Sequence, residues 1–300
     1  MAESKTAVMA AIAANAAIAV TKFAAAAVTG SSAMISEGVH SIVDMGNGGM
    51  LLLGIERSKA PADDLHPFGH GKELYFWTLI VAISIFGIGG GISLYEGIIH
   101  VLHPGPIEPP FWNYATLLLA IVFESISGYI ALRGFLAEKG PRGWIEFVRE
   151  GKDPTAYAVL FEDGAALLGL VFALTGIALT QLTQNAVFDG AASIAIGLLL
   201  AAVAFVLAGK SKGLLLGECA DPKVVRDIER IARADADIVH VSRALTMQMG
   251  PNEVVVDLEV AVRPDLDASG LREALRRVER NVRERHPQIT HMYVELTEAP

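Results

Sequence analysis

The chain has 300 residues, 52% of them hydrophobic, with a mean hydropathy of +0.44 and a formal net charge of −9. This composition is too apolar for an ordinary soluble domain, and the acidic balance argues against nucleic acid as a partner. The single cysteine, Cys219, excludes an internal disulfide and a zinc site built from cysteines.

Charge is distributed unevenly along the chain. Residues 1–208 contain 10 Lys/Arg and 17 Asp/Glu, whereas the much shorter segment 209–300 contains 14 and 16. A membrane-spanning helix needs about 20 mostly apolar residues. Six segments meet this requirement: 6–28, 33–57, 74–101, 112–134, 154–180 and 187–208. We therefore expect a membrane domain over 1–208 and a soluble domain over 209–300. The first apolar run is too long for a signal peptide and lacks a clear cleavage site, so we expect none.

The loops between these spans alternate in charge. The loops after the second, fourth and sixth spans contain basic residues such as Arg57, Lys139 and Lys210, whereas the other loops contain no Lys or Arg. Basic loops remain on the cytoplasmic side of a membrane. We therefore expect both termini and the soluble domain to be cytoplasmic. A buried helical bundle in a soluble protein would not produce this alternation.

The last 92 residues have the patterns of a small mixed domain. Helical periodicity, alternating strands and a Gly-Pro-Asn turn predict the order αββαβ. The predicted elements are a helix at 221–234, strands at 238–250 and 252–262, a helix from a cap at Ser269 to before Pro287, and a strand at 289–298. The fold prediction is an all-α membrane domain of six transmembrane helices followed by a cytoplasmic α+β domain.

The second span contains a histidine and an aspartate at membrane depth. A charge there costs ~2.5–3.5 kcal/mol on insertion scales, so such residues normally face the bundle interior and have a function. His40 and Asp44 are four residues apart and share one helix face. Imidazole nitrogen and carboxylate oxygen supply half of a tetrahedral site for a divalent metal such as zinc. The other half can come from Glu162 and Asp163, the only adjacent acids in any span.

Other interpretations of these polar residues exist. His40 alone can be a hydrogen-bonded core histidine. The pair Glu162 and Asp163 can cap a helix or pair with Lys152, although both lie about a turn and a half inside the span. Lys22, deep in the first span, can extend its ammonium outward or pair with Glu124.

Several segments together resemble the cation diffusion facilitator family. They are SEGVHSIVDMGN at 36–47, PADDLHPFGHGKE at 61–73, EDGAALLG at 162–169, DGAASIAIGLLL at 189–200 and the αββαβ tail. The resemblance covers nearly the whole chain. It implies a homodimeric exporter with six spans and a metallochaperone-like cytoplasmic domain, which exchanges Zn²⁺ or a similar divalent ion for protons.

The resemblance also implies the ligands of the transport site. The family pattern has two ligands four residues apart in each of the second and fifth spans. His40 and Asp44 match the first pair and Asp163 matches the last position, but the remaining position is Val159. Either Glu162 supplies the missing ligand or three protein ligands and water complete the site. His40 favours Zn²⁺ over Mn²⁺, while Fe²⁺, Co²⁺, Ni²⁺ and Cd²⁺ stay possible.

Two further metal sites follow from the same resemblance. Asp63, His66 and His70 would form one in the loop after the second span; turn formation is the alternative role of that loop. His240, Asp257 and Glu295 occupy the positions of a metal site in the tail. Carboxylates replace histidines there and one ligand is lost, so solvated strand residues are the favoured interpretation.

The functional prediction is a divalent metal/proton antiporter without a cofactor. Metal ligands must be deprotonated, so metal binding releases protons and protonation releases metal. A membrane metal sensor or scaffold without transport is the alternative that the Val159 substitution leaves open. An enzyme is not expected: a membrane metallohydrolase would need a catalytic base, and no HExxH-type motif is present.

Overall fold

The computed structural model describes residues 2–29, 32–104, 111–141 and 143–298. They form two compact units. Unit 1 comprises Met1–Glu56, Phe76–Val148 and Asp153–Lys212, and unit 2 comprises Arg57–Tyr75, Arg149–Lys152 and Gly213–Pro300. Unit 2 therefore combines the tail with two segments that precede it in the sequence.

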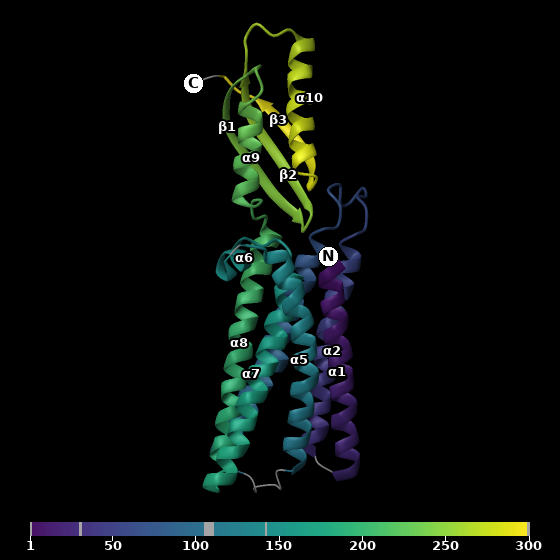
Figure 1. Ribbon diagram of the computed structural model, residues 1–300, viewed down its shortest axis with the longest axis vertical. Coiled ribbons are helices and arrows are strands. Elements are labelled where there is room, and N and C mark those ends of the chain that lie inside the picture. Colours follow the sequence, from purple (N-terminus) through teal and green to yellow (C-terminus); the bar gives the residue numbers. More distant parts are fainter. Residues whose placement is uncertain (1, 30–31, 105–110, 142, 299–300) are drawn as a thin grey trace. The chain divides into compact units, whose positions relative to one another are not determined.

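Unit 1 is built from helices (Figure 1). The helical part of the chain contains α1 (Ala2–Thr29), α2 (Ser32–Arg57), α3 (Glu73–Ser84), the π-helix η1 (Ile85–Gly90), α4 (Gly91–Leu102), α5 (Phe111–Lys139), α6 (Trp144–Glu150), α7 (Pro154–Thr183) and α8 (Val187–Leu216). Helix α7 begins with Pro154 at its first position, and the Asp153 carboxylate accepts the N–H of Thr155 as a cap.

Five stretches in the described part of the chain are long and apolar enough to cross a membrane: Lys5–Ala25, Glu73–Leu102, Asn113–Ala137, Tyr157–Thr183 and Val187–Leu216. They correspond to five of the six predicted spans and confirm a mostly helical membrane domain. The predicted span 33–57 forms α2, which is not among the five. Its acids, Asn47 and several glycines lower its hydropathy.

Helix α8 continues eight residues past the predicted end of the sixth span, to Leu216. We expected Lys210 and Lys212 to lie beyond the span. They continue the helix instead, because lysine has a high helix propensity. The helix ends at Gly217, whose φ of +108° favours glycine. The N–H groups of Gly217 and Glu218 both donate to the carbonyl of Gly213.

Glycines bring α4 and α8 into close contact. A Cβ added at Gly97 would lie 2.7 Å from the backbone nitrogen of Ile194 and 2.8 Å from the carbonyl oxygen of Gly190. A Cβ at Gly197 would lie 2.9 Å from the backbone nitrogen of Leu94. Because backbone atoms cannot move aside cheaply, these positions admit no side chain at the present helix spacing.

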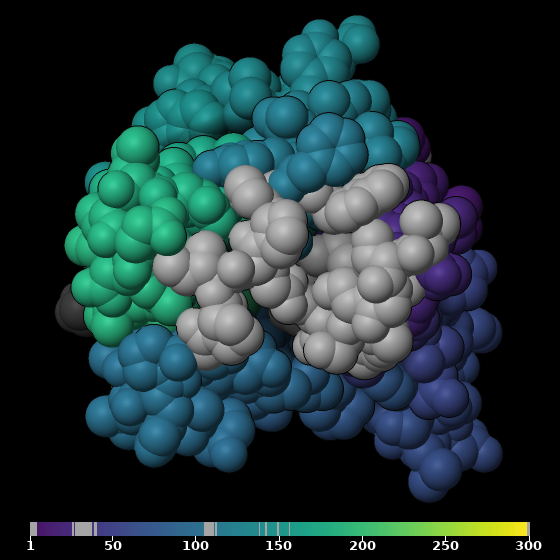
Figure 2. Space-filling view, turned by 90° about the horizontal axis from the view of Figure 1, so that it is seen from below, coloured from purple at the N-terminus to yellow at the C-terminus, as the bar shows by residue number. Residues whose placement is uncertain are grey.

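Helix α5 packs against both α1 and α7. Gly128 of α5 faces Asp163 of α7, where an added Cβ would lie 3.7 Å from the Asp163 Cβ. Seen from below, α1 and α8 lie on opposite sides of the bundle (Figure 2). Ser127 of α5 and Asp163 of α7 are both buried where these two helices meet.

The tail contains α9 (Pro222–Arg233), β1 (Ile238–Gly250), β2 (Glu253–Val262), α10 (Ala268–Arg285) and β3 (Ile289–Leu296), which confirms the αββαβ order. The sheet order is β1-β2-β3, with β2 antiparallel to β1 and parallel to β3. Ile228 of α9 and Val278 of α10 pack against Val256 and Leu258 of β2. The predicted cap at Ser269 is wrong, because Asp267 accepts the Gly270 N–H at 2.7 Å and starts the helix earlier.

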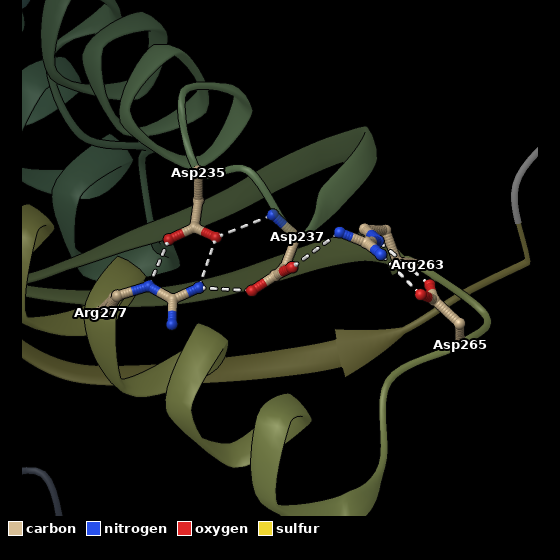
Figure 3. Close-up of polar contacts among 5 residues, drawn as sticks. All are labelled: Asp235, Asp237, Arg263, Asp265 and Arg277. Carbon is tan, nitrogen blue, oxygen red and sulfur yellow. Dashed lines mark hydrogen bonds and ion pairs between the residues drawn. The ribbon is translucent and has the colours of Figure 1, made fainter.

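A chain of ion pairs connects the elements of the tail (Figure 3). The Arg277 guanidinium donates to both oxygens of Asp235 at 3.0 and 2.9 Å, and to Asp237 at 2.7 Å. Arg263 pairs with Asp237 at 3.7 Å and donates to Asp265. The Arg277 hydrogen bonds hold the pKa of Asp235 below its usual value. This network ties α10 to the turn before β1 and to the end of β2.

The loop between α2 and α3 packs against the turn between β1 and β2 within unit 2. A Cβ at Gly71 would lie 2.6 Å from the Met249 carbonyl oxygen and 2.5 Å from Glu253 Oε2. Phe68 contacts His291 edge-on, with ring centroids 5.2 Å apart. Glu253 Oε2 is buried without a hydrogen-bond partner among the described residues, and burial raises the pKa of Glu253. The lack of a side chain at Gly71 therefore permits the contact between the loop and the β1–β2 turn. Ionisation of the Glu253 carboxyl weakens this contact.

Gly97→Ala tests the contact between α4 and α8. The added methyl meets backbone, so we expect a loss of roughly 1–3 kcal/mol in the free energy of unfolding. Thermal unfolding of the detergent-purified protein measures it. Gly87→Ala is the matched control, since nothing lies within 4 Å of its added Cβ. A Gly97→Ala variant as stable as the Gly87→Ala variant would contradict the packing described.

Glu253→Gln tests the contact between the loop and the sheet. A raised pKa in the folded protein means that the protonated carboxyl stabilises this contact below about pH 4.3, and that the stabilisation is lost as pH rises through the folded-state pKa. Glutamine stays neutral, so we expect the variant to unfold at a higher temperature than the wild type at pH 7 and at a similar temperature at pH 4. A fluorophore on Cys219, which is exposed, reports the transition.

The control for this experiment is Glu284→Gln, an exposed glutamate of α10. It should show no pH-dependent difference from the wild type. A Glu253→Gln variant that unfolds at a lower temperature than the wild type at pH 7 would refute the account of this contact.

Candidate metal centre

Unit 1 encloses a cavity of about 270 Å³ between its helices. Apolar and polar residues both line it. The polar and charged lining residues are Asn15 and Lys22 of α1, Ser41, Asp44 and Asn47 of α2, Ser84, Ser93 and Glu96 of the third span, Glu124 of α5, Glu162 and Asp163 of α7, and Ser193 of α8. The cavity thus collects acidic groups from four different helices: α2, α4, α5 and α7.

Helix α2 carries the predicted ligands His40 and Asp44 and a further polar residue, Asn47. His40, Asp44 and Asn47 follow one another at intervals of four and three residues, so they lie along one helix face. Asp44 is half-buried and lines the cavity. The side chain of His40 lies outside the described part of the structure. The pairing of His40 with Asp44 therefore stays a prediction.

Helix α7 contributes two adjacent acids. Asp163 is 2% exposed and accepts a hydrogen bond from Ser127 Oγ of α5 at 2.7 Å. Glu162 Oε1 accepts a hydrogen bond from Asn47 Nδ2 of α2 at 3.2 Å. Although consecutive residues point about 100° apart on a helix, both acids line the cavity. Val159 is buried and does not line it.

One buried cation accompanies these acids. Lys22 is 8% exposed, lines the cavity and donates to Ser41 Oγ at 3.3 Å. Its ammonium therefore lies inside the bundle. Glu124, 6% exposed, lies within electrostatic range of Lys22, Asp44 and Asp163. Of the two roles that the sequence left open for Lys22, the structure favours the interaction with Glu124.

The charge of the cavity determines what it can bind. Asp44, Glu124, Glu162 and Asp163 cannot all be ionised at close range in a low-dielectric interior unless cations compensate them. Lys22 supplies a single positive charge. The arrangement therefore favours a divalent cation or protons, and the carboxylate oxygens are suitable ligands for the former.

The loop residues Asp63, His66 and His70 come together within unit 2. The Asp63 carboxylate contacts His66 Nδ1 at 3.2 Å and His70 Nε2 at 3.0 Å, and the three potential ligand atoms lie within 4.8 Å of one another. Hydrogen bonds from the His66 N–H and the His70 ring lower the pKa of Asp63 to about 2. In the described part of the chain, no other trio of His, Cys, Asp and Glu residues meets this distance.

The predicted tail residues do not form such a cluster within one chain. Asp257 pairs with Tyr293 across the sheet, Glu295 pairs with Glu259, and His240 pairs with Ala261. The three candidates thus occupy different rungs of the ladder. This separation matches the interpretation of them as solvated strand residues.

Sequence reasoning missed the two residues that hydrogen-bond to the acids of α7: Asn47, which lines the cavity, and Ser127, which does not. Asn47 continues the face that carries His40 and Asp44, and Ser127 lies one turn beyond Glu124 on α5. Spacing could have identified Asn47 as a third member of the α2 face. Nothing in the local sequence indicates that Ser127 reaches Asp163, 36 residues away in the chain.

Comparison with known proteins also points to a protein that binds metal cations. The family model for the cation efflux transmembrane domain matches residues 8–216. The chain is 32% identical over 266 residues to the human protein named "Proton-coupled zinc antiporter SLC30A9, mitochondrial", with 86% of this chain and 47% of the human protein covered.

Two further relatives match most of this chain. The mouse protein named "Proton-coupled zinc antiporter SLC30A9, mitochondrial" is 34% identical over 233 residues, which is 76% of this chain and 41% of that protein. Metal tolerance protein C4 of Arabidopsis thaliana is 29% identical over 234 residues, which is 77% of this chain and 51% of that protein. The chain spans about half the length of these relatives. Since the matched transmembrane domain extends over more than half of the chain, this protein belongs to the cation diffusion facilitator family, as its motifs predicted.

Proposed function

We propose that this protein is an antiporter that exports a divalent transition metal, most favourably Zn²⁺, in exchange for protons. The observation that carries the proposal is the cavity between the helices, where Asp44, Glu162 and Asp163 converge. His40, four residues before Asp44 on α2, is the proposed nitrogen ligand. The relatives named as proton-coupled zinc antiporters support the choice of ion and of exchange partner. Membership of a transporter family argues for transport rather than enzymatic turnover.

The exchange follows from the chemistry of the ligands. Carboxylate and imidazole groups bind a metal only when deprotonated, so an arriving dication displaces protons and arriving protons displace the dication. His40 in its neutral form supplies the nitrogen ligand that favours zinc. Fe²⁺, Co²⁺, Ni²⁺, Cd²⁺ and Mn²⁺ are the other ions to be compared.

The membrane arrangement proposed here completes the account. Helix α2 would cross the membrane as the second of six spans, with its polar face turned to the cavity. Both termini would lie in the cytoplasm, as the basic loops after the second, fourth and sixth spans indicate. The sheet domain would join two chains in a homodimer. Alternating access would then expose the cavity first to the cytoplasm and then to the opposite side.

We further propose that Asp63, His66 and His70 bind a second metal ion in the loop. Two imidazoles and one carboxylate are a common donor set for zinc, and a water molecule can supply the fourth ligand. The contacts of the same loop with the β1–β2 turn would transmit occupancy of this site to the sheet. No such role is proposed for His240, Asp257 and Glu295.

Flux through proteoliposomes tests the transport site. We expect zinc movement driven by a pH gradient in the wild type, and its loss in His40→Ala, Asp44→Ala and Asp163→Ala, because each substitution removes a ligand. A fluorescent zinc indicator inside the vesicles measures uptake. Asp189→Asn is the matched control, since Asp189 belongs to α8 but does not line the cavity.

Two results would reject the transport proposal. Wild-type vesicles that show no pH-driven movement of any divalent ion would reject antiport and leave the sensor or scaffold alternative. Flux that survives the three ligand substitutions would reject the proposed site.

Metal analysis of the purified protein tests the loop site. The double substitution His66→Ala and His70→Ala should lower the number of zinc ions bound per chain by one, because it removes two of three ligands. Equilibrium dialysis followed by elemental analysis gives this number. His103→Ala, which alters an exposed histidine outside the cluster, serves as control. An unchanged zinc content in the double variant would contradict this second site.

A further inference from the structure

Asn47 is a buried polar residue of the cavity to which neither the sequence motifs nor the family resemblance assigns a role. It is 2% exposed and lines the cavity from α2. Its amide nitrogen donates to Glu162 Oε1 at 3.2 Å. Its side-chain oxygen, Oδ1, is buried and has no hydrogen-bond partner among the described residues. One half of this amide is therefore satisfied by the opposite helix and the other half is available.

A buried carbonyl oxygen without a partner is unfavourable. Leaving such a group unsatisfied costs roughly 1–3 kcal/mol, and native structures rarely tolerate this without a functional reason. Amide oxygens are neutral, hard donors that bind cations in many protein sites. An orphan amide oxygen at the wall of an acidic cavity therefore points to a cation as its partner.

The position of Asn47 fits the gap in the ligand pattern. The fifth span lacks a ligand one turn before Asp163, because Val159 occupies that place and is buried away from the cavity. Asn47 lies one turn after Asp44 on α2 and holds Glu162, the neighbour of Asp163, by its amide nitrogen. The missing donor of α7 can thus be replaced from α2.

We propose that Asn47 is a ligand of the transported ion, and that its side-chain oxygen together with Glu162 replaces the donor lost at Val159. This inference rests on the proposed transport function. With Asn47 as a ligand, the site has more oxygen donors than a site with one histidine from each of α2 and α7 would have. His40 is then its only nitrogen donor. Oxygen donors suit Mn²⁺ as well as Zn²⁺, whereas imidazole favours Zn²⁺. Asn47 therefore sets how strongly the protein discriminates between these two ions.

The test compares binding of zinc and of manganese to the full-length protein by calorimetry in detergent at one pH. His66→Ala and His70→Ala are present throughout to remove binding at the loop. Asn47→Ala should weaken the affinity for both ions by about tenfold or more. Asn47→Asp keeps an oxygen donor and should retain binding of both ions. Asn47→His supplies nitrogen and should raise the ratio of zinc affinity to manganese affinity.

A second comparison separates a ligand from a residue that only positions Glu162. If Asn47 binds the ion itself, Asn47→Ala weakens binding further when Glu162→Gln is already present. If it only orients Glu162, the added substitution has no effect and the proposal is overturned. Thr180→Val removes another buried hydroxyl without a described partner, outside the cavity, and should leave both affinities unchanged.

The outcomes also separate this inference from the proposed function. Wild-type protein that transports zinc, combined with an Asn47→Ala variant of normal affinity, overturns the role of Asn47 alone. An Asn47→His variant with the wild-type affinity ratio does the same, and it applies even where Asn47→Ala fails to fold. Wild-type protein without metal flux overturns the transport function instead.

Discussion

The burial of several carboxylates inside a helical bundle is the constraint on which the rest of this structure depends. Asp44, Glu124 and Asp163 line one cavity between the helices, and Lys22, which lines the same cavity, offsets part of their charge. Such a cluster is stable only when protons or a cation neutralise it. The same instability makes the cluster suitable for exchange, because the two kinds of positive charge replace each other at one place.

The packing of the helices supports this cluster. Ser127 holds Asp163 by a short hydrogen bond, and Gly128 lets α5 approach α7 at the same level. On the other side, Gly97 and Gly197 bring α4 and α8 together without intervening side chains. Small residues thus occupy the contacts between helices and leave the polar side chains to the cavity. Unit 2 has its own apolar core and ion-pair network, so its fold does not depend on the acids of the bundle.

Much of the fold follows from local sequence patterns. Hydropathy predicted the helical domain, alternation predicted the αββαβ tail, and the family resemblance grouped Asp63 with His66 and His70. Hydropathy also predicted a span at 33–57, but the acids, Asn47 and glycines of α2 leave this helix outside the five described stretches that are long and apolar enough to cross a membrane. The contact between Asn47 and Glu162 joins residues 115 positions apart, so no local pattern could predict it. For the same reason, only the tertiary structure shows that Val159 is buried outside the cavity and that Asn47 lies beside Glu162.

The most direct test is to locate the metal. Crystals of the zinc-loaded protein, measured at the zinc absorption edge, would show the ion by its anomalous scattering. The account predicts a peak inside the cavity, bound between Asp44 of α2 and Asp163 of α7, and the loss of that peak when Asp163 is replaced by alanine. A zinc-loaded protein that transports the ion but shows anomalous peaks only in unit 2 would contradict it.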